Sequence, residues 1–347
     1  MTALTNNLQP LGMAQLLDRA IRLYRNNFLI FVGIVAIAQI PAAIVNMIGL
    51  WLAPAPTFNP AATVTDMWLQ IAQSSGFGNN PWVWLGRLVT LLLVQLATAA
   101  MTKAVAENYL GHKIDLFGAY RKIGRSGVIL LLATFIGIFI VIALGIWWII
   151  VPCLGWFTGL GMIFFFALVV LPLVAPVVVL ERRGALEALQ RAWDLARRRF
   201  WWLIGFMLLL GIFGQLVVTG PAILSVFIIN SVLGSSVDAT TSTLIQQVIG
   251  LLLNLIYLPL QLTCVTLLYF DVRVRTEGFD LALLALSKQA DAESLTTTAP
   301  PLDKSAIPAW EELGYFALIT IAIVALYIAL ILIILLLTFG LSGLSGF

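Results

Sequence analysis

Five long stretches of this chain contain no Asp, Glu, Lys or Arg. They cover residues 26–65, 126–180, 200–237, 239–270 and 313–347. A helix rises about 1.5 Å per residue and crosses a hydrocarbon core of about 30 Å in about 20 residues, so each stretch can hold a membrane span. The stretch 126–180 has 55 residues, which is too long for one crossing and suits a helical hairpin.

The composition agrees with a membrane protein, because 61% of the 347 residues are hydrophobic and only 10% are charged. A water-soluble enzyme has about a quarter of its residues charged, and a disordered chain is poor in apolar residues. A backbone in lipid must satisfy its own hydrogen bonds, which a helix does. We therefore predict an all-α polytopic protein with seven spans: Phe28–Leu52, Trp82–Met101, Val128–Val151, Leu154–Leu180, Phe200–Val218, Leu244–Phe270 and Tyr315–Phe339.

The basic residues predict the orientation of these spans. With seven spans and a cytoplasmic N-terminus, 18 of the 19 Lys and Arg residues fall on the cytoplasmic side, and Arg87 is the exception. This is the distribution that the positive-inside rule describes. It places the chain in the plasma membrane with its C-terminus outside, and it makes Ala222–Leu233 the bent outer end of the fifth span.

The same reasoning divides the chain into four parts. Residues 1–27 form a cytoplasmic amphipathic helix, and residues 28–285 form a six-span body of three helical hairpins. Residues 286–312 are polar and rich in Thr and Pro, which is typical of a linker. Residues 313–347 hold the seventh span and a tail.

The chain matches itself at an offset of 172 residues. Segment 16–34 lies on segment 188–206 with identities such as Arg19/Arg191 and Gly33/Gly205, and a third basic segment, 117–127, precedes the third span. This pattern predicts a unit of one basic amphipathic helix and one hairpin, used three times around an axis along the membrane normal. The alternative is a chance similarity that arises from the richness in Arg and Leu.

The amphipathic segments follow helical spacing. The predicted apolar stripes are Leu17, Ala20, Ile21, Tyr24 and Phe28 in the first segment and Leu186, Leu189, Trp193, Ala196 and Phe200 in the other. The pairs Glu187–Arg191 and Asp194–Arg198 stand at i,i+4. Such helices lie in the interface with their arginines near anionic headgroups, so membrane lipids are the expected partners. The alternative is anchoring without lipid recognition.

No residue pattern in the chain predicts catalysis. His112 is the single histidine, and phosphate-binding and zinc-binding motifs are missing from the sequence. We expect no catalytic residue, no metal site, no cofactor and no nucleic-acid partner. Cys153 and Cys264 are predicted near opposite faces of the membrane, so we expect no disulfide between them.

Six residues are candidates for binding: Arg87, Arg191, Asp271, Arg273, Arg275 and Glu277. Arg87 is the only charge inside a predicted span, and an intramembrane arginine is a functional candidate unless it reaches the interface by snorkelling. Asp271–Arg275 and Arg273–Glu277 form i,i+4 pairs if the segment is helical, and Gly278 can end that helix. This run is either a salt-bridged stop or a docking surface.

Two segments carry a resemblance to a known family: LPLVAPVVVLERRGALEALQRAWDLARRRFWW at 171–202 and LLYFDVRVRTEGFDL at 267–281. They resemble the membrane domain found with some bacterial glycerophosphoryl diester phosphodiesterases, over about residues 11–285. The resemblance implies an uncharacterised bacterial integral membrane protein. It does not imply the phosphodiesterase reaction, because the family's catalytic domain uses a histidine pair that this chain lacks.

Two functions remain open at this point. The first is a non-enzymatic membrane protein, a lipid-associated scaffold or assembly factor whose protein partners are unknown. The second is a permease for a small or amphipathic solute, because Pro172 and Pro176 kink the fourth span and broken helices build transporter sites.

Overall fold

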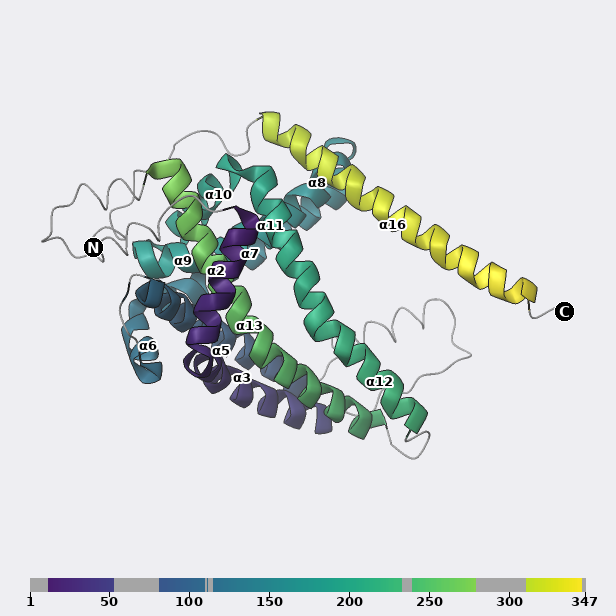
Figure 1. The fold of residues 1–347 in the computed structure, drawn as a ribbon. Coiled ribbons are helices and arrows are strands. Elements are labelled where there is room, and N and C mark those ends of the chain that lie inside the picture. Colours follow the sequence, from purple (N-terminus) through teal and green to yellow (C-terminus); the bar gives the residue numbers. More distant parts are fainter. Residues whose placement is uncertain are drawn as a thin grey trace, which may run out of the picture.

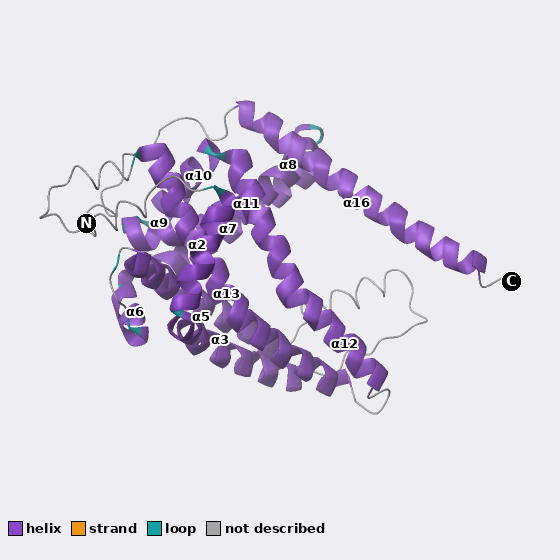
Figure 2. Cartoon of the chain, viewed as in Figure 1, coloured by secondary structure: helices purple, strands orange, loops and turns teal. Residues whose placement is uncertain are grey.

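A computed structural model describes residues 12–52, 81–109, 111, 115–232, 239–278 and 310–344. These residues form helices joined by short turns and contain no strand (Figure 2). Seven helical segments are long and apolar enough to cross a membrane. The predicted all-α polytopic fold is therefore confirmed, and the chain is treated below as a membrane protein.

Four of the seven segments are single helices, and two are longer runs with a π-helical turn in the middle; the seventh stands apart at the end of the chain. In chain order the segments are α3 (Phe28–Trp51), α5 (Pro81–Tyr109), α7 (Arg125–Ile150), α8–η2–α9 (Leu154–Phe165, Phe166–Val170, Leu171–Glu181), α11–η3–α12 (Phe200–Gly214, Gln215–Thr219, Gly220–Val232), α13 (Ala239–Glu277) and α16 (Trp310–Leu344).

Three short helices precede the odd-numbered spans of the body: α2 (Met13–Asn26), α6 (Leu116–Ile123) and α10 (Ala185–Arg198). The bounds of α2 and α10 differ by 172 residues at both ends. The preceding glycines also match, with φ −65° and ψ 161° at Gly12 and φ −64° and ψ 164° at Gly184. The two segments that the self-match aligns, α2 and α10, therefore share helix bounds and cap geometry, whereas α6 is shorter and follows Asp115.

The three units contact one another in a closed ring. The second spans of the units, α5, α9 and α13, contact one another. Each short helix packs on the second span of the unit before it: α6 on α5, α10 on α9 and α2 on α13. The last of these contacts joins the third unit to the first.

Small and apolar side chains fill the space where the second spans meet. Ala100 and Ala104 of α5, Val177 of α9 and Cys264 of α13 are fully buried. Small residues let helices approach closely in a membrane, where packing rather than the hydrophobic effect holds helices together. The ring is therefore held by close packing of its three second spans.

The seventh helix, α16, lies outside the ring and packs on α8 (Figure 1). A Cβ atom at Gly161 would collide with the backbone of Phe316, and the Gly161 amide donates to the Thr320 hydroxyl at 2.9 Å. Of the predicted linker, residues 286–309 lie outside the described residues, and residues 310–312 already belong to α16.

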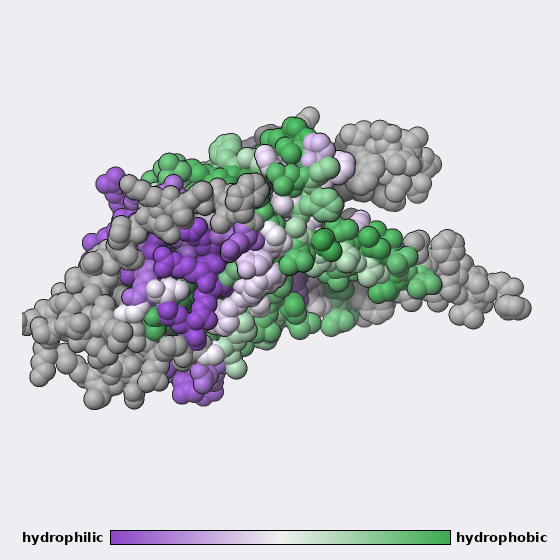
Figure 3. All heavy atoms as spheres, turned by 90° about the horizontal axis from the view of Figure 1, so that it is seen from above, coloured by the Kyte–Doolittle hydropathy of each residue, from purple (hydrophilic) through white to green (hydrophobic). Residues whose placement is uncertain are grey.

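Polar residues gather at one end of the molecule, and apolar side chains cover the helices that extend from it (Figure 3). We call this the polar end; it contains α2, α6, α10 and the C-terminal ends of α5, α9 and α13. Exposed apolar residues such as Leu132, Ile142 and Leu326 lie along the spans, where a membrane would cover them.

Candidate functional site

A group of buried charged residues lies at the polar end, where α9, α10 and α13 meet. We call it the buried ion-pair cluster; its members are Glu181, Arg183, Arg191, Tyr269, Arg273 and Glu277. The side chains of Glu181 and Arg191 are only 0% and 1% exposed. The cluster therefore belongs to the interior of the protein.

Glu181, the last residue of α9, is the acceptor at the centre of the cluster. Its carboxylate accepts hydrogen bonds from Arg183 Nε at 2.9 Å and from Arg191 Nε at 3.2 Å. The Tyr269 hydroxyl donates to the other carboxylate oxygen at 2.8 Å. One carboxylate thus connects α9 with both α10 and α13.

Further hydrogen bonds close the cluster into a circuit. Arg191 donates to Glu277, which also accepts from Arg273 Nε at 3.0 Å. Arg273 in turn donates to the Tyr269 hydroxyl at 3.2 Å. The order around the circuit is Glu181, Arg191, Glu277, Arg273 and Tyr269.

A closed circuit explains how four charges stay buried together. Removing an ion from water costs several kcal/mol, on the order of the gain from a good ion pair, so a buried pair needs further hydrogen bonds to be tolerated. Here the carboxylates of Glu181 and Glu277 face the guanidinium groups of Arg191 and Arg273. The Tyr269 hydroxyl accepts from Arg273 and donates to Glu181. Such satisfied networks fix one arrangement of the elements that carry them.

The structure corrects the predicted surface role of Arg191 and the two predicted ion pairs of α10. Arg191 pairs with Glu181 and Glu277 rather than with Glu187, and Asp194 pairs with Arg197 at 3.3 Å rather than with Arg198. Since Arg191 is buried, it cannot contact a headgroup at the surface of this conformation. The local pattern of α10 did not contain Glu181 and Glu277, because both lie outside this helix.

The predicted apolar stripes are correct only in part. Ala20 and Tyr24 are buried as expected, but Leu16 takes the place of Ile21, which is 42% exposed. In α10, Leu189, Trp193 and Ala196 are buried, while Leu186 is 62% exposed. Both helices therefore bury one face against a neighbouring unit, α2 against α13 and α10 against α9.

Asp271 and Arg275, the other two candidates on α13, form the second predicted i,i+4 ion pair. Asp271 accepts from Arg275 Nε at 2.8 Å, and the Arg275 guanidinium lies over the Trp202 ring at 5.7 Å. Both predicted i,i+4 pairs of this run are confirmed. Gly278, with φ 62°, follows the last helical residue as predicted.

Arg87 lies far from the other candidates. Its side chain is exposed, and its guanidinium lies 5.9 Å from the centre of the Trp84 ring. Along α5 it is about 33 Å from Tyr109 at the polar end, at about 1.5 Å per residue. The structure therefore brings together Arg191, Arg273 and Glu277, with Asp271 and Arg275 beside them, and leaves Arg87 at the opposite end.

Three members of the cluster escaped the sequence analysis: Glu181, Arg183 and Tyr269. Glu181 did carry a signal, because it is the first charged residue after the uncharged stretch 126–180 and is followed by Arg182 and Arg183. Nothing in the local sequence distinguishes Tyr269 from the apolar residues around it in α13.

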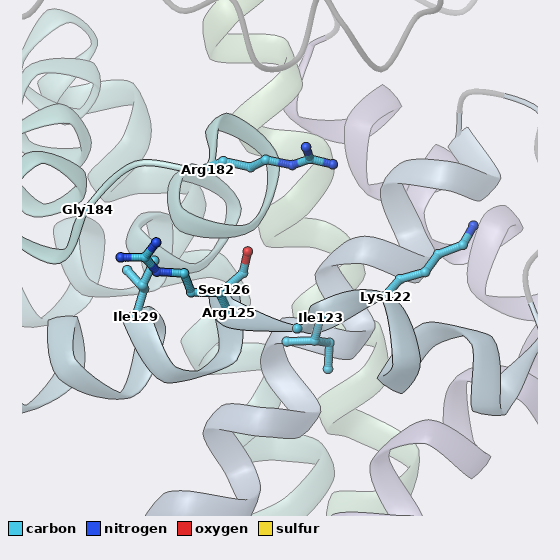
Figure 4. Close-up of a pocket in the computed structure, with 8 residues that line it drawn as sticks. Lys122, Ile123, Arg125, Ser126, Ile129, Arg182 and Gly184 are labelled. Carbon is cyan, nitrogen blue, oxygen red and sulfur yellow. The ribbon is translucent and has the colours of Figure 1, made fainter.

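A second polar feature of this end is an open groove of about 440 Å³ (Figure 4). We call it the basic groove; it lies between the α6–α7 junction and the α9–α10 turn. Three of its lining residues are cationic, and none is acidic. The lining residues are Lys122, Ile123, Gly124, Arg125, Ser126, Ile129, Arg182 and Gly184.

Other chemistry-bearing residues do not converge. Among the described residues, no group of three His, Cys, Asp or Glu side chains could hold a metal ion. His112 lies outside the described residues. Cys153 is an exposed thiol in the turn between α7 and α8, and Cys264 is a buried thiol in α13.

Comparison with known proteins identifies no relative: no protein-family model, no curated protein and no solved structure is significantly similar to this chain.

Proposed function

We propose that this chain is a non-enzymatic, multi-pass membrane protein that acts as a lipid-associated scaffold or assembly factor. The observation that carries the proposal is the buried ion-pair cluster. Its charged groups bond to one another and hold α9, α10 and α13 together. A charged group committed in this way supports a rigid platform and is a poor acid, base or nucleophile.

The proposal includes an orientation in the plasma membrane, with the N-terminus and the polar end in the cytoplasm and the C-terminus outside. The support is the concentration of Lys and Arg at the polar end, which the positive-inside rule places on the cytoplasmic side. Cys153 then faces the outside, since it lies in the turn at the far end of α7.

The native cysteines provide a test of this orientation. A membrane-impermeant maleimide should label Cys153 on intact cells or spheroplasts, and Cys153→Ser should abolish the signal because Cys264 is buried. A cysteine placed at Lys122 in the Cys153→Ser background should react only after permeabilisation. Labelling of the Lys122→Cys variant from outside would overturn the orientation.

Lipid association is tested by extracting the protein from native membranes into polymer-bounded nanodiscs. We expect the anionic phospholipids that surround it to be enriched over the bulk membrane. A matched extraction of an unrelated polytopic protein of similar span number is the control. Equal lipid compositions around the two proteins would contradict a lipid-associated scaffold.

One observation favours the alternative, a permease for a small or amphipathic solute. The fourth and fifth spans each contain a π-helical turn, and Pro172 and Pro176 follow the first of these turns. Such turns often occur at functional sites. Solute flux in proteoliposomes that is lost in Pro176→Ala but kept in an exposed-surface variant would establish the permease and refute the scaffold.

The likeness to the membrane domain of bacterial glycerophosphoryl diester phosphodiesterases, including a bacterial origin, is also part of the proposal. Arg273 and Glu277 lie in the motif DVRVRTEGFD (271–280) of the segment that carries this likeness, and both belong to the buried ion-pair cluster. That position supports a structural role for the motif.

A further inference from the structure

We propose that the basic groove binds the phosphate group of an anionic phospholipid. This inference rests on the proposed function and deepens it, because it assigns the lipid contact to one place in the ring. Arg191, the buried arginine of α10, is committed to protein carboxylates, so a lipid must be held by other cations.

Three cationic residues line the groove; in Figure 4 the Arg125 side chain points to one side, and the Lys122 and Arg182 side chains point to the other. Lys122 and Arg125 come from the α6–α7 junction, and Arg182 comes from the turn after α9. Lys122 is bonded to Glu107 at 2.9 Å, whereas Arg125 has no ion-pair partner within the described part of the chain. With no acid in the lining, the groove suits a ligand with negative charge.

Arg125 occupies a position that sets this unit apart from the other two. It is the first residue of α7, and the first residues of α3 and α11 are Phe28 and Phe200. In the third unit, Phe200 packs into the aromatic residues Phe165 and Phe316. The second unit has an exposed cation where the others have an aromatic ring.

The backbone around the groove also departs from ordinary geometry. Arg182 has φ 54° and ψ 33°, in the left-handed region that few non-glycine residues adopt. This turn carries Glu181 into the buried ion-pair cluster and leaves the Arg182 side chain exposed beside the groove. The cluster thereby holds one wall of the groove in place.

The apolar side of the groove fits a lipid better than a soluble phosphate compound. Ile123 and Ile129 line it, and α7 continues from it toward the far end of the protein. Leu132 is 55% exposed and follows Arg125 by two helical turns, so both lie on one side of α7. A phosphate held at Arg125 would leave the acyl chains along this apolar face.

The test uses the full-length protein in a neutral detergent and native mass spectrometry. The probes are dioctanoyl phosphatidylglycerol, dioctanoyl phosphatidylcholine and inorganic phosphate. Arg125→Phe installs the residue type of the other two units, and Arg182→Gly removes the cation while keeping a residue that accepts positive φ. Arg25→Gln is the matched control, because it removes one exposed arginine from α2, away from the groove.

We expect the first phosphatidylglycerol to bind about fivefold more weakly in each groove variant and about 25-fold more weakly in the double variant, as the attraction per cation near anionic lipid implies. Arg25→Gln should bind as the parent does. Unfolding temperatures report whether each variant is folded. Arg182→Gly relieves backbone strain, so it still tests the groove if the Arg125→Phe protein does not fold.

Equal phosphatidylglycerol binding by the parent, the groove variants and the control would overturn the proposal. Phosphatidylcholine that binds as tightly as phosphatidylglycerol, or inorganic phosphate that displaces the lipid at equal concentration, would overturn the assignment to an anionic lipid. Solute flux with intact lipid binding would refute only the scaffold function, so the two proposals fail separately.

Discussion

The first and third units of the ring begin with matching helices, but the arginine at the same place in each helix has different surroundings. Arg19 on α2 and Arg191 on α10 stand at the same place in helices whose bounds differ by 172 residues. Arg19 is half-buried and donates to the Tyr109 hydroxyl at 3.2 Å, whereas Arg191 is buried between Glu181 and Glu277. The residues at the ends of neighbouring spans decide the difference.

This comparison shows which property of a unit is local and which is not. Both helices follow a glycine in extended conformation, and both bury the same three helical positions: Leu16, Ala20 and Tyr24 in α2 and Ala188, Ala192 and Ala196 in α10. These features follow from the helical period of each segment. The burial of a charge depends on acids that other segments supply.

The largest difference is expected when the two arginines are removed in turn. Arg191→Ala leaves Glu181 and Glu277 buried without their partner, which should lower the free energy of unfolding by about 3–5 kcal/mol. Arg19→Ala removes the hydrogen bond to the Tyr109 hydroxyl, the loss of which should cost about 1 kcal/mol. Unfolding by sodium dodecyl sulfate in mixed micelles measures both. Equal losses would mean that the units are energetically equivalent.

Replacing Glu181 at the end of α9 should likewise cost more stability than replacing Glu107 near the end of α5. Glu181→Gln keeps the shape but leaves buried guanidinium groups with less negative charge, at a cost of about 2–3 kcal/mol. Glu107 is 13% exposed and pairs with Lys122, whose side chain is 52% exposed, so Glu107→Gln should cost less than about 1 kcal/mol.

A double variant sharpens this prediction. In the Glu181→Gln background, Arg191→Met should cost less than it does alone, because the two residues share one network and their effects do not add. Additive losses would show that the circuit of hydrogen bonds does not act as a unit.

A smaller difference in stability is expected at alkaline pH, and it comes from Tyr24 in the first unit. The Tyr24 hydroxyl donates to the Ile256 carbonyl at 2.8 Å, and burial raises the pKa of Tyr24 from 10.0 to about 12. The unfolded phenol ionises first, so this contribution is complete below pH 10 and is lost as the pH rises toward 12. The third unit has Ala196 at this position.

Thermal unfolding of the parent and Tyr24→Phe between pH 9 and pH 11.5 checks this expectation. At pH 9 the variant should be less stable by about 1 kcal/mol, the value of one hydrogen bond. The gap should narrow as the pH rises. A gap that stays constant would exclude ionisation of Tyr24 as its cause. Tyr120 has its pKa raised to about 12 by burial and titrates in both proteins, so it cancels in the comparison.

The smallest effect is expected at the helix caps. A Cβ at Gly184 would meet no atom within 4 Å, and the backbone there is already extended. Gly184→Ser should therefore stabilise α10 by a few tenths of a kcal/mol, about the usual gain for a serine cap over glycine. Gly12→Ser should gain at least as much, because the added hydroxyl would complete a capping box with Gln15, whose side chain already accepts from the Gly12 amide at 3.1 Å.

The sequence was sufficient for the spans and for pairs within one helix. Uncharged stretches predicted six of the seven membrane-crossing helices, because the lipid core disfavours charge along a span, and the remaining span, Trp82–Met101, was predicted with Arg87 inside it. The pairs Asp271–Arg275 and Arg273–Glu277 were predictable, because helical geometry alone brings residues four positions apart together. The sixth span was predicted to end at Phe270, before the first charge, and the helix itself continues to Glu277, one residue before Gly278.

The partners of Arg191 could not be predicted in the same way. Glu181 is ten residues away across a turn, and Glu277 is 86 residues away on another span. Only the ring, which sets α10 between α9 and α13, brings them together. The basic groove was missed for the same reason, since its two walls, the α6–α7 junction and the turn after α9, lie far apart in the sequence.

The contact between α2 and α13 has a consequence for the order of the chain. Because the third unit already touches the first, the order in which the units are synthesised is not what defines their neighbours. A gene that begins with the second unit and ends with the first should encode the same assembly, provided that a new connection spans the joined ends. Circular permutation of this kind would identify the hairpin, rather than the whole polypeptide, as the building block that insertion into the bilayer must respect.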